Sequence, residues 1–111
     1  MLVTIDTQLI TDWPSFHHVF ATTFGFFDGY GRNLNAWIDC MTGLDDDPVQ
    51  NLAAVTCAKG EIVVLQLEHS ADFAAREPAM FQTLLDCTAF VNWRRIETGG
   101  VAIVALSYYK L

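Results

Sequence analysis

The sequence predicts an α/β fold in which a three-stranded parallel sheet packs against about four helices in a single pair of layers. Three short apolar runs, over residues 2–5, 62–67 and 101–107, are the candidate strands. Two helical segments separate each run from the next, and parallel pairing requires a long crossover of this kind. A chain of 111 residues suits one hydrophobic core, so we expect residues 1–111 to form a single domain.

The first helix is expected to run from a cap at Thr11 or Asp12 to a break at Gly25. Its aromatic residues recur at positions that can face a core, and a proline is tolerated in the first turn. A loop that contains Gly29-Tyr30-Gly31 follows, because glycine adopts backbone angles that other residues resist. The aromatic residues of this helix are Trp13, Phe16, Phe20 and Phe24.

The second helix carries the residues on which a functional prediction depends. Asn33 is a good N-cap, and Gly43 stands where a helix would end in a left-handed residue. A polar flank is expected about a third of a turn from the buried side, formed by Asn35, Asp39 and Thr42. The apolar stripe that predicts the buried side consists of Leu34, Trp37, Ile38 and Met41.

The second half of the chain predicts the remaining strands and helices. Residues 62–67 form an apolar run that is typical of a strand buried on both faces. Ser70 can cap a short helix, and a longer one is expected to restart at Glu77-Pro78 and end near Glu97. One face of the longer helix is apolar and includes Met80, Leu84, Cys87 and Val91.

Charge is distributed unevenly along the chain. The formal net charge is −7, and residues 1–47 hold seven aspartates against one arginine, a net charge of −6. A surface that binds phosphate needs clustered positive charge, so direct binding to nucleic acid or to an anionic membrane is not expected. The acidic segment is either a solvated surface or a surface for a basic partner.

The cysteines and the apolar runs predict the cellular compartment of the protein. Cys40, Cys57 and Cys87 are odd in number and lack metal-ligand spacing, which favours reduced thiols. No basic segment precedes an apolar run at the N-terminus, and Val101–Leu106 is far too short for a membrane span. We therefore expect a soluble, cytoplasmic protein.

Fifteen contiguous residues, from Gly29 to Gly43, carry a specific pattern. They comprise a Tyr-Gly loop, Asn-Leu at the start of a helix, an alanine one turn in, an Asp-Cys pair and a closing Thr-Gly. The pattern resembles the signature of the barstar family, small intracellular inhibitors of secreted bacterial ribonucleases. The resemblance implies a barstar-like three-stranded parallel fold, as the strand order also predicts, and an antitoxin-like or immunity-like role.

A partner-binding site is implied by the same resemblance. An acidic helix and the loop before it would enter the cationic cleft of a ribonuclease, where a carboxylate replaces a substrate phosphate. Asp39 would be the central anchor, and this requires its carboxylate to face outward, with no guanidinium of the same molecule bound to it. The other residues of the implied site are Tyr30, Gly31, Asn33, Asn35, Thr42 and Gly43.

Departures from the family pattern keep an alternative open. Asn35 stands where the best-known member has an acid, and Arg94 and Arg95 lie where an acidic residue would support the binding face. The segment between Asp45 and Glu61 is also longer than the corresponding family connection. The alternative is an interaction or regulatory module on the same fold, without a nuclease target.

Catalysis, a cofactor and a metal are not predicted. His17 and His18 are adjacent on a helix and point about 100° apart, so they make a poor metal pair, and we expect both to be partly exposed. Cys40 is expected to be a packed or idle thiol. An enzyme that combines Asp39 with a histidine ranks last, because no nucleotide-binding, zinc-protease or nucleophile-elbow motif is present. The oligomeric state is not predicted.

Overall fold

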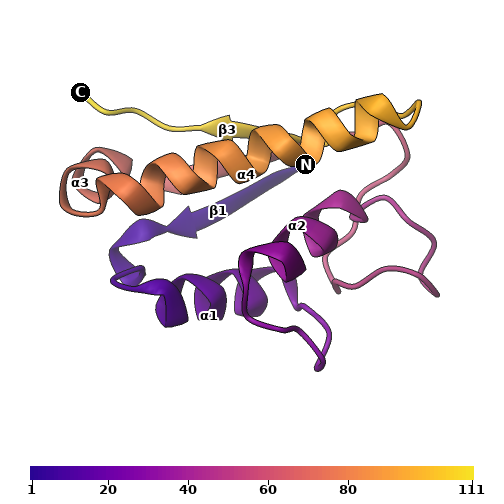
Figure 1. Ribbon diagram of the computed structural model, residues 1–111, viewed down its shortest axis with the longest axis horizontal. Helices are drawn as coiled ribbons and strands as arrows, with labels where there is room; N and C mark the ends of the chain where they lie inside the picture. The colour runs from indigo at the N-terminus through magenta and orange to yellow at the C-terminus, as the bar shows by residue number, and fades with distance from the viewer.

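The fold of the computed structural model, which describes residues 1–111, is built on a parallel sheet in the order β1-β2-β3 (Figure 1). Leu2 of β1 pairs with Val64 of β2, and Val63 of β2 pairs with Val104 of β3. The predicted α/β class with a three-stranded parallel sheet is therefore confirmed. The elements are β1 (Leu2–Asp6), a 3-10 turn (Thr7–Leu9), α1 (Trp13–Phe24), α2 (Leu34–Thr42), β2 (Val63–Glu68), α3 (Ser70–Arg76), α4 (Pro78–Glu97) and β3 (Val104–Ser107).

Most helix boundaries lie where the capping residues predict them. Asp12 and Ser15 form a reciprocal capping box at the start of α1, and Gly25 ends that helix with a φ of +63°. Asn33 caps α2, with its Oδ1 accepting from the amide of Ala36 at 2.8 Å. Capping chemistry is local in sequence, which is why it predicts these boundaries well.

Two boundary predictions are wrong. Gly43 is not left-handed, since its φ is −101°. Ser70 does not cap α3, because His69 precedes the helix at a φ of +60° and Ser70 is its first residue. The Ser70 hydroxyl instead donates to the carbonyl of Tyr109 at 2.8 Å and accepts from the Tyr109 amide at 3.0 Å. A long-range partner at the C-terminal segment has displaced the local cap.

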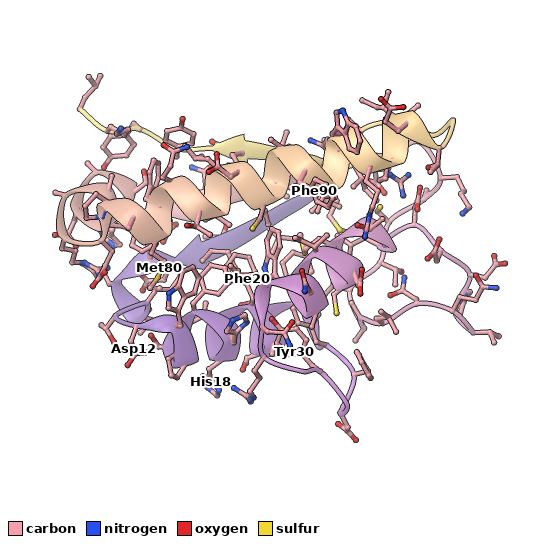
Figure 2. All side chains as sticks on the ribbon, viewed as in Figure 1. Asp12, His18, Phe20, Tyr30, Met80 and Phe90 are labelled. Atoms are coloured by element: carbon pink, nitrogen blue, oxygen red, sulfur yellow. The ribbon has the colours of Figure 1, made fainter.

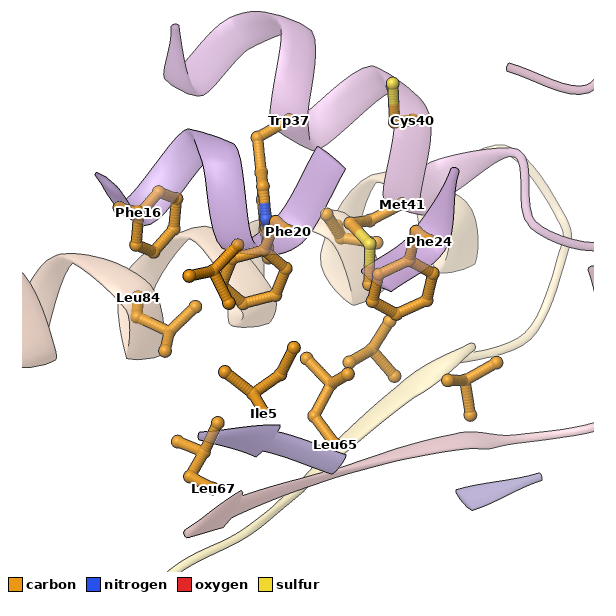
Figure 3. Close-up of a cluster of buried hydrophobic side chains, with 14 of the residues drawn as sticks. Ile5, Phe16, Phe20, Phe24, Trp37, Cys40, Met41, Leu65, Leu67 and Leu84 are labelled. Carbon is orange, nitrogen blue, oxygen red and sulfur yellow. The ribbon is translucent and has the colours of Figure 1, made fainter. Parts of the chain in front are cut away.

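The sheet buries one face, against the helices. Burial alternates along β2, where Val63, Leu65 and Leu67 are buried and Gln66 is exposed. The expectation that this strand is buried on both faces is wrong, because the helical crossovers leave the second face of the small sheet open. Figure 3 shows Ile5, Leu65 and Leu67 pointing from the strands into the space filled by helix side chains, among them Phe20, Trp37 and Leu84.

The long connection between α2 and β2 is tied to the core although it has no helix. The carbonyl of Leu44 accepts from the Cys57 amide at 2.9 Å, and Asn51 Nδ2 donates to the same carbonyl at 3.3 Å. Phe26 and Ala53 form an isolated antiparallel bridge. None of the helices is both long enough and apolar enough to cross a membrane.

Candidate partner-binding face

Helix α2 divides into a buried side and an exposed polar side. Trp37, Cys40 and Met41 are at most 1% exposed. Figure 3 shows Trp37 and Met41 pointing from α2 toward the side chains of the sheet, whereas the Cys40 side chain leaves the helix on another side. Asn35 and Asp39 are exposed. Of the predicted stripe, Trp37 and Met41 are buried and Leu34 and Ile38 are half-buried, and of the predicted flank Thr42 is half-buried. Burial raises the pKa of the Cys40 thiol to about 11, consistent with a packed, unreactive cysteine.

The loop before α2 is held by a buried hydrogen bond. The Nδ1 atom of His17 on α1 and the hydroxyl of Tyr30 are 2.5 Å apart, and both residues are less than 10% exposed. Burial is the main reason that the pKa of His17 is lowered and that of Tyr30 is raised, so both groups stay neutral near pH 7. The expectation that His17 is partly exposed is wrong, whereas His18 is exposed. The buried Tyr30 side chain therefore ties the loop to α1; Figure 2 labels Tyr30 in that loop.

The small residues of the predicted site lie in close contacts. A Cβ atom on Gly43 would come within 2.6 Å of Asp46 Oδ2, and one on Gly31 would lie 3.0 Å from Asn33 Nδ2. Asn33 Nδ2 also donates to the Gly31 carbonyl at 3.3 Å. In both cases the nearest atom is the end of a flexible side chain, so a side chain at either glycine would displace Asp46 or Asn33 rather than the backbone of α2.

Asp39 faces outward but is not unpaired. Its side chain is 59% exposed, and its Oδ1 accepts from both Nη1 and Nη2 of Arg94, each at 3.2 Å. Nη2 of Arg94 also donates to the hydroxyl of Thr42 at 2.5 Å. The expectation that the Asp39 carboxylate faces outward is confirmed. The expectation that no guanidinium of the same molecule binds it is wrong, because Arg94 does so. Oδ2 of Asp39 accepts no hydrogen bond from the chain.

The next arginine on α4 is engaged more deeply. Arg95 Nη1 and Nη2 donate to the two carboxylate oxygens of Asp45 at 3.0 and 2.7 Å. Nη1 also donates to the Thr42 carbonyl at 2.7 Å, and Nε donates to the Val101 carbonyl at 2.8 Å. The Arg95 hydrogen bonds hold the pKa of Asp45 below its usual value. This pair joins the C-terminal ends of α2 and α4.

A polar cleft lies between those two helix ends. Its lining is almost entirely hydrophilic, and Val101 is the one apolar residue in it. Its charged residues are three acids and three bases, so the cleft has no net charge: Asp39, Asp45, Asp46, Lys59, Arg94 and Arg95. The strongly acidic segment of the sequence is thus neutralised at this place by cations from later in the chain.

The sequence predicted the residues of α2 that form this face, but it did not predict that Arg94 of α4 binds two of them. Asn35, Asp39 and Thr42 lie on one helix, and Arg94 joins the last two of them. Sequence reasoning had treated Arg94 as a departure from the family pattern and gave no sign of its pairing, because 55 positions separate it from Asp39. No three histidine, cysteine or acidic side chains lie close enough together to hold a metal ion.

The sequence was compared with models of known protein families. The chain presents an exposed carboxylate on a short helix that packs with a three-stranded parallel sheet. The model of the Barstar family, described as barstar, the barnase inhibitor, matches residues 1–104. The chain therefore belongs to the Barstar family, as the fifteen-residue pattern implied. No curated protein matches its sequence.

Proposed function

We propose that the protein inhibits a basic ribonuclease by inserting α2 and the loop before it into the active-site cleft of that enzyme. Family membership supports an inhibitor role like that of the barnase inhibitor. The observation that carries the proposal is the Asp39 carboxylate, which stands 59% exposed on a helix with a rigid, buried inner side. A carboxylate held in this way can accept the hydrogen bonds that a nuclease normally donates to phosphate.

The Arg94 pair changes how the carboxylate can be used. Arg94 binds one oxygen of Asp39 and leaves Oδ2 free, so a cation of the partner can approach that oxygen without displacing Arg94. Carboxylates accept several hydrogen bonds at once, and the intramolecular bond fixes the orientation of the group before binding. We therefore expect the partner cation to join the existing pair.

Long-range charge supports the same partner class. The chain carries a net charge of −7, and the charged residues that line the cleft at Asp39 balance, so the excess negative charge lies on the rest of the molecule. Such a field speeds the encounter with a basic protein and weakens as salt is added. We further propose that the chain acts in the cytoplasm as a single domain, without catalytic activity of its own and without binding nucleic acid.

The test uses barnase as the probe, with cleavage of RNA as the readout and titration calorimetry at low salt for affinity. Wild-type protein should suppress cleavage. Asp39→Ala should bind at least about 30-fold more weakly, which corresponds to about 2 kcal/mol for a central interface residue. The fold should persist, because the buried side of α2 is untouched.

The control for charge is Glu68→Ala, which removes one exposed carboxylate at the end of β2. It should bind barnase within about twofold of wild type, since rim and distant charges act mainly on association rate. Equal affinity of wild type and Asp39→Ala would show that the anchor is elsewhere.

A second candidate is an interaction module without a nuclease target. Asn35 adds no charge to the face, and Arg94 and Arg95 neutralise Asp39 and Asp45, which weakens the attraction of this face for a cationic cleft. Under this alternative, wild-type protein leaves the cleavage of RNA by barnase unchanged at any concentration, whereas the inhibitor proposal requires a concentration-dependent loss of activity.

A further inference from the structure

An exposed stripe on α4 lies next to the Asp39 pair. Its residues are separated by four, three and four positions, a spacing that places them on one helix face. All of them are exposed, although two are large aromatic residues. The stripe, here called the α4 aromatic face, consists of Asp86, Phe90, Trp93 and Glu97.

The two aromatic rings form a stacked pair that remains largely exposed, with Arg94 over one side of Phe90. Phe90 and Trp93 have ring centroids 6.0 Å apart with an interplanar angle of 19°. Phe90 is 44% exposed and Trp93 is 58% exposed. Leaving this much aromatic surface in water is unfavourable, and tryptophan is among the residue types enriched at the positions that dominate binding energy.

Acidic residues border the rings on both sides along the helix. Asp86 accepts a hydrogen bond from Gln82 Nε2 at 2.9 Å, and neither Asp86 nor Glu97 forms an ion pair within the chain. Asp39 and Asp45, by contrast, both have arginine partners. Negative charge that is uncompensated therefore flanks an exposed aromatic pair.

The α4 aromatic face is continuous with the proposed binding face of α2. The Arg94 guanidinium lies 5.9 Å from the Phe90 ring centroid and also binds Asp39. Helical geometry turns Trp93 about 100° away from Arg94, so the outer side of the aromatic pair is free of that cation. Figure 2 shows Phe90 on α4 where that helix passes α2.

We propose that the α4 aromatic face binds an arginine side chain on the same basic partner that α2 binds. This inference rests on the proposed function, and it adds a second anchor to that interface. A planar guanidinium can stack on Trp93 while it donates hydrogen bonds to Asp86 or Glu97. The same arrangement selects a partner with two separated basic groups, one for Asp39 and one for α4.

The decisive variant is Trp93→Ala, measured with barnase as the probe by titration calorimetry. Binding should weaken about tenfold, and the fold should be unaffected because this ring is exposed. Tyr109→Ala is the matched control, since Tyr109 is an aromatic residue with the same 58% exposure on the C-terminal segment. It should bind as wild type does. Equal binding of wild type and Trp93→Ala overturns the inference.

Charge is tested separately. A double variant, Asp86→Asn with Glu97→Gln, should bind barnase more weakly and show less loss of affinity when salt is raised. Glu68→Gln removes one exposed carboxylate outside the α4 aromatic face and should leave the affinity within about twofold of wild type. If the double variant binds as tightly as wild type, the acidic border has no role and the inference fails.

The outcomes separate this inference from the proposed function. Loss of binding in Asp39→Ala together with wild-type binding in Trp93→Ala leaves α2 as the anchor and removes α4. If wild-type protein does not bind barnase, both proposals fall. Sedimentation across a range of concentrations tests for a second copy of the chain: a dimer that dissociates in Trp93→Ala would show that self-association covers the rings, and would also overturn the inference.

Discussion

Two neighbouring arginines of α4 pair with aspartates of the first half of the chain, in very different surroundings. The pair between Arg94 and Asp39 is exposed, with side-chain exposures of 34% and 59% and a shortest distance of 3.2 Å. The pair between Arg95 and Asp45 is buried, with exposures of 14% and 5% and a distance of 2.7 Å. Arg94 and Arg95 are adjacent on α4, yet water screens the pair that Arg94 forms and is largely excluded from the pair that Arg95 forms.

The difference teaches which pair holds the fold and which is available for recognition. Exposed ion pairs contribute little to stability because water screens them and the side chains lose entropy. A buried pair whose hydrogen bonds are satisfied becomes costly to break, because the remaining partner is left as a charge without a counter-ion. Arg95 therefore serves the junction of α2 and α4, while Arg94 and Asp39 remain accessible to a partner.

The largest effect is expected for Arg95→Ala. The substitution leaves Asp45 buried without its cation and frees the carbonyls of Thr42 and Val101. We expect the free energy of unfolding, measured by urea denaturation, to fall by about 3–5 kcal/mol. Arg94→Ala is the adjacent control and should cost no more than about 1 kcal/mol. Equal losses in the two variants would remove the distinction between the pairs.

A smaller, pH-dependent effect is expected from Asp45. Its pKa is lowered in the folded state, chiefly by the hydrogen bonds from Arg95, so its stabilising contribution is complete above the unfolded pKa of about 3.9. That contribution is lost as the pH falls through the lower folded pKa. The difference in unfolding free energy between wild type and Asp45→Asn should therefore shrink below about pH 4.

The control for this effect uses the Arg95→Ala background. Without the guanidinium, the main cause of the lowered pKa is gone, so the same Asp45→Asn comparison should change much less with pH. A pH dependence that persists unchanged in that background would show that another group lowers the pKa of Asp45.

Local chemistry explains why much of the fold could be predicted from the sequence. The cap at Asp12, the end of α1 at Gly25 and the cap at Asn33 each depend on residues within a few positions, and all three lie where expected. The parallel order of the strands follows from the helical crossovers between them. Ser70 shows the limit, because its hydroxyl binds Tyr109, 39 positions away.

The candidate site could be predicted less well, since long-range pairs decide its charge. In the sequence, residues 1–47 look strongly acidic, yet Arg94 and Arg95 return from 55 and 50 positions away to neutralise Asp39 and Asp45. The position of Asp39 on an exposed flank followed from helical spacing. Its partner did not, because no periodicity relates one helix to another across the core.

The smallest effect is expected for the coupling between Arg94 and Asp39. A double-mutant cycle with Arg94→Ala and Asp39→Ala, measured by urea denaturation, should give an interaction energy of about 0.2–1 kcal/mol. The value should decline as salt is raised, because water and ions reach a pair with 34% and 59% exposure. A coupling of 3 kcal/mol or more would mean that the fold depends on this pair as it does on Arg95 and Asp45. Asp39 would then be committed to the interior contacts of its own chain, and the carboxylate proposed to bind a nuclease would no longer be free to do so.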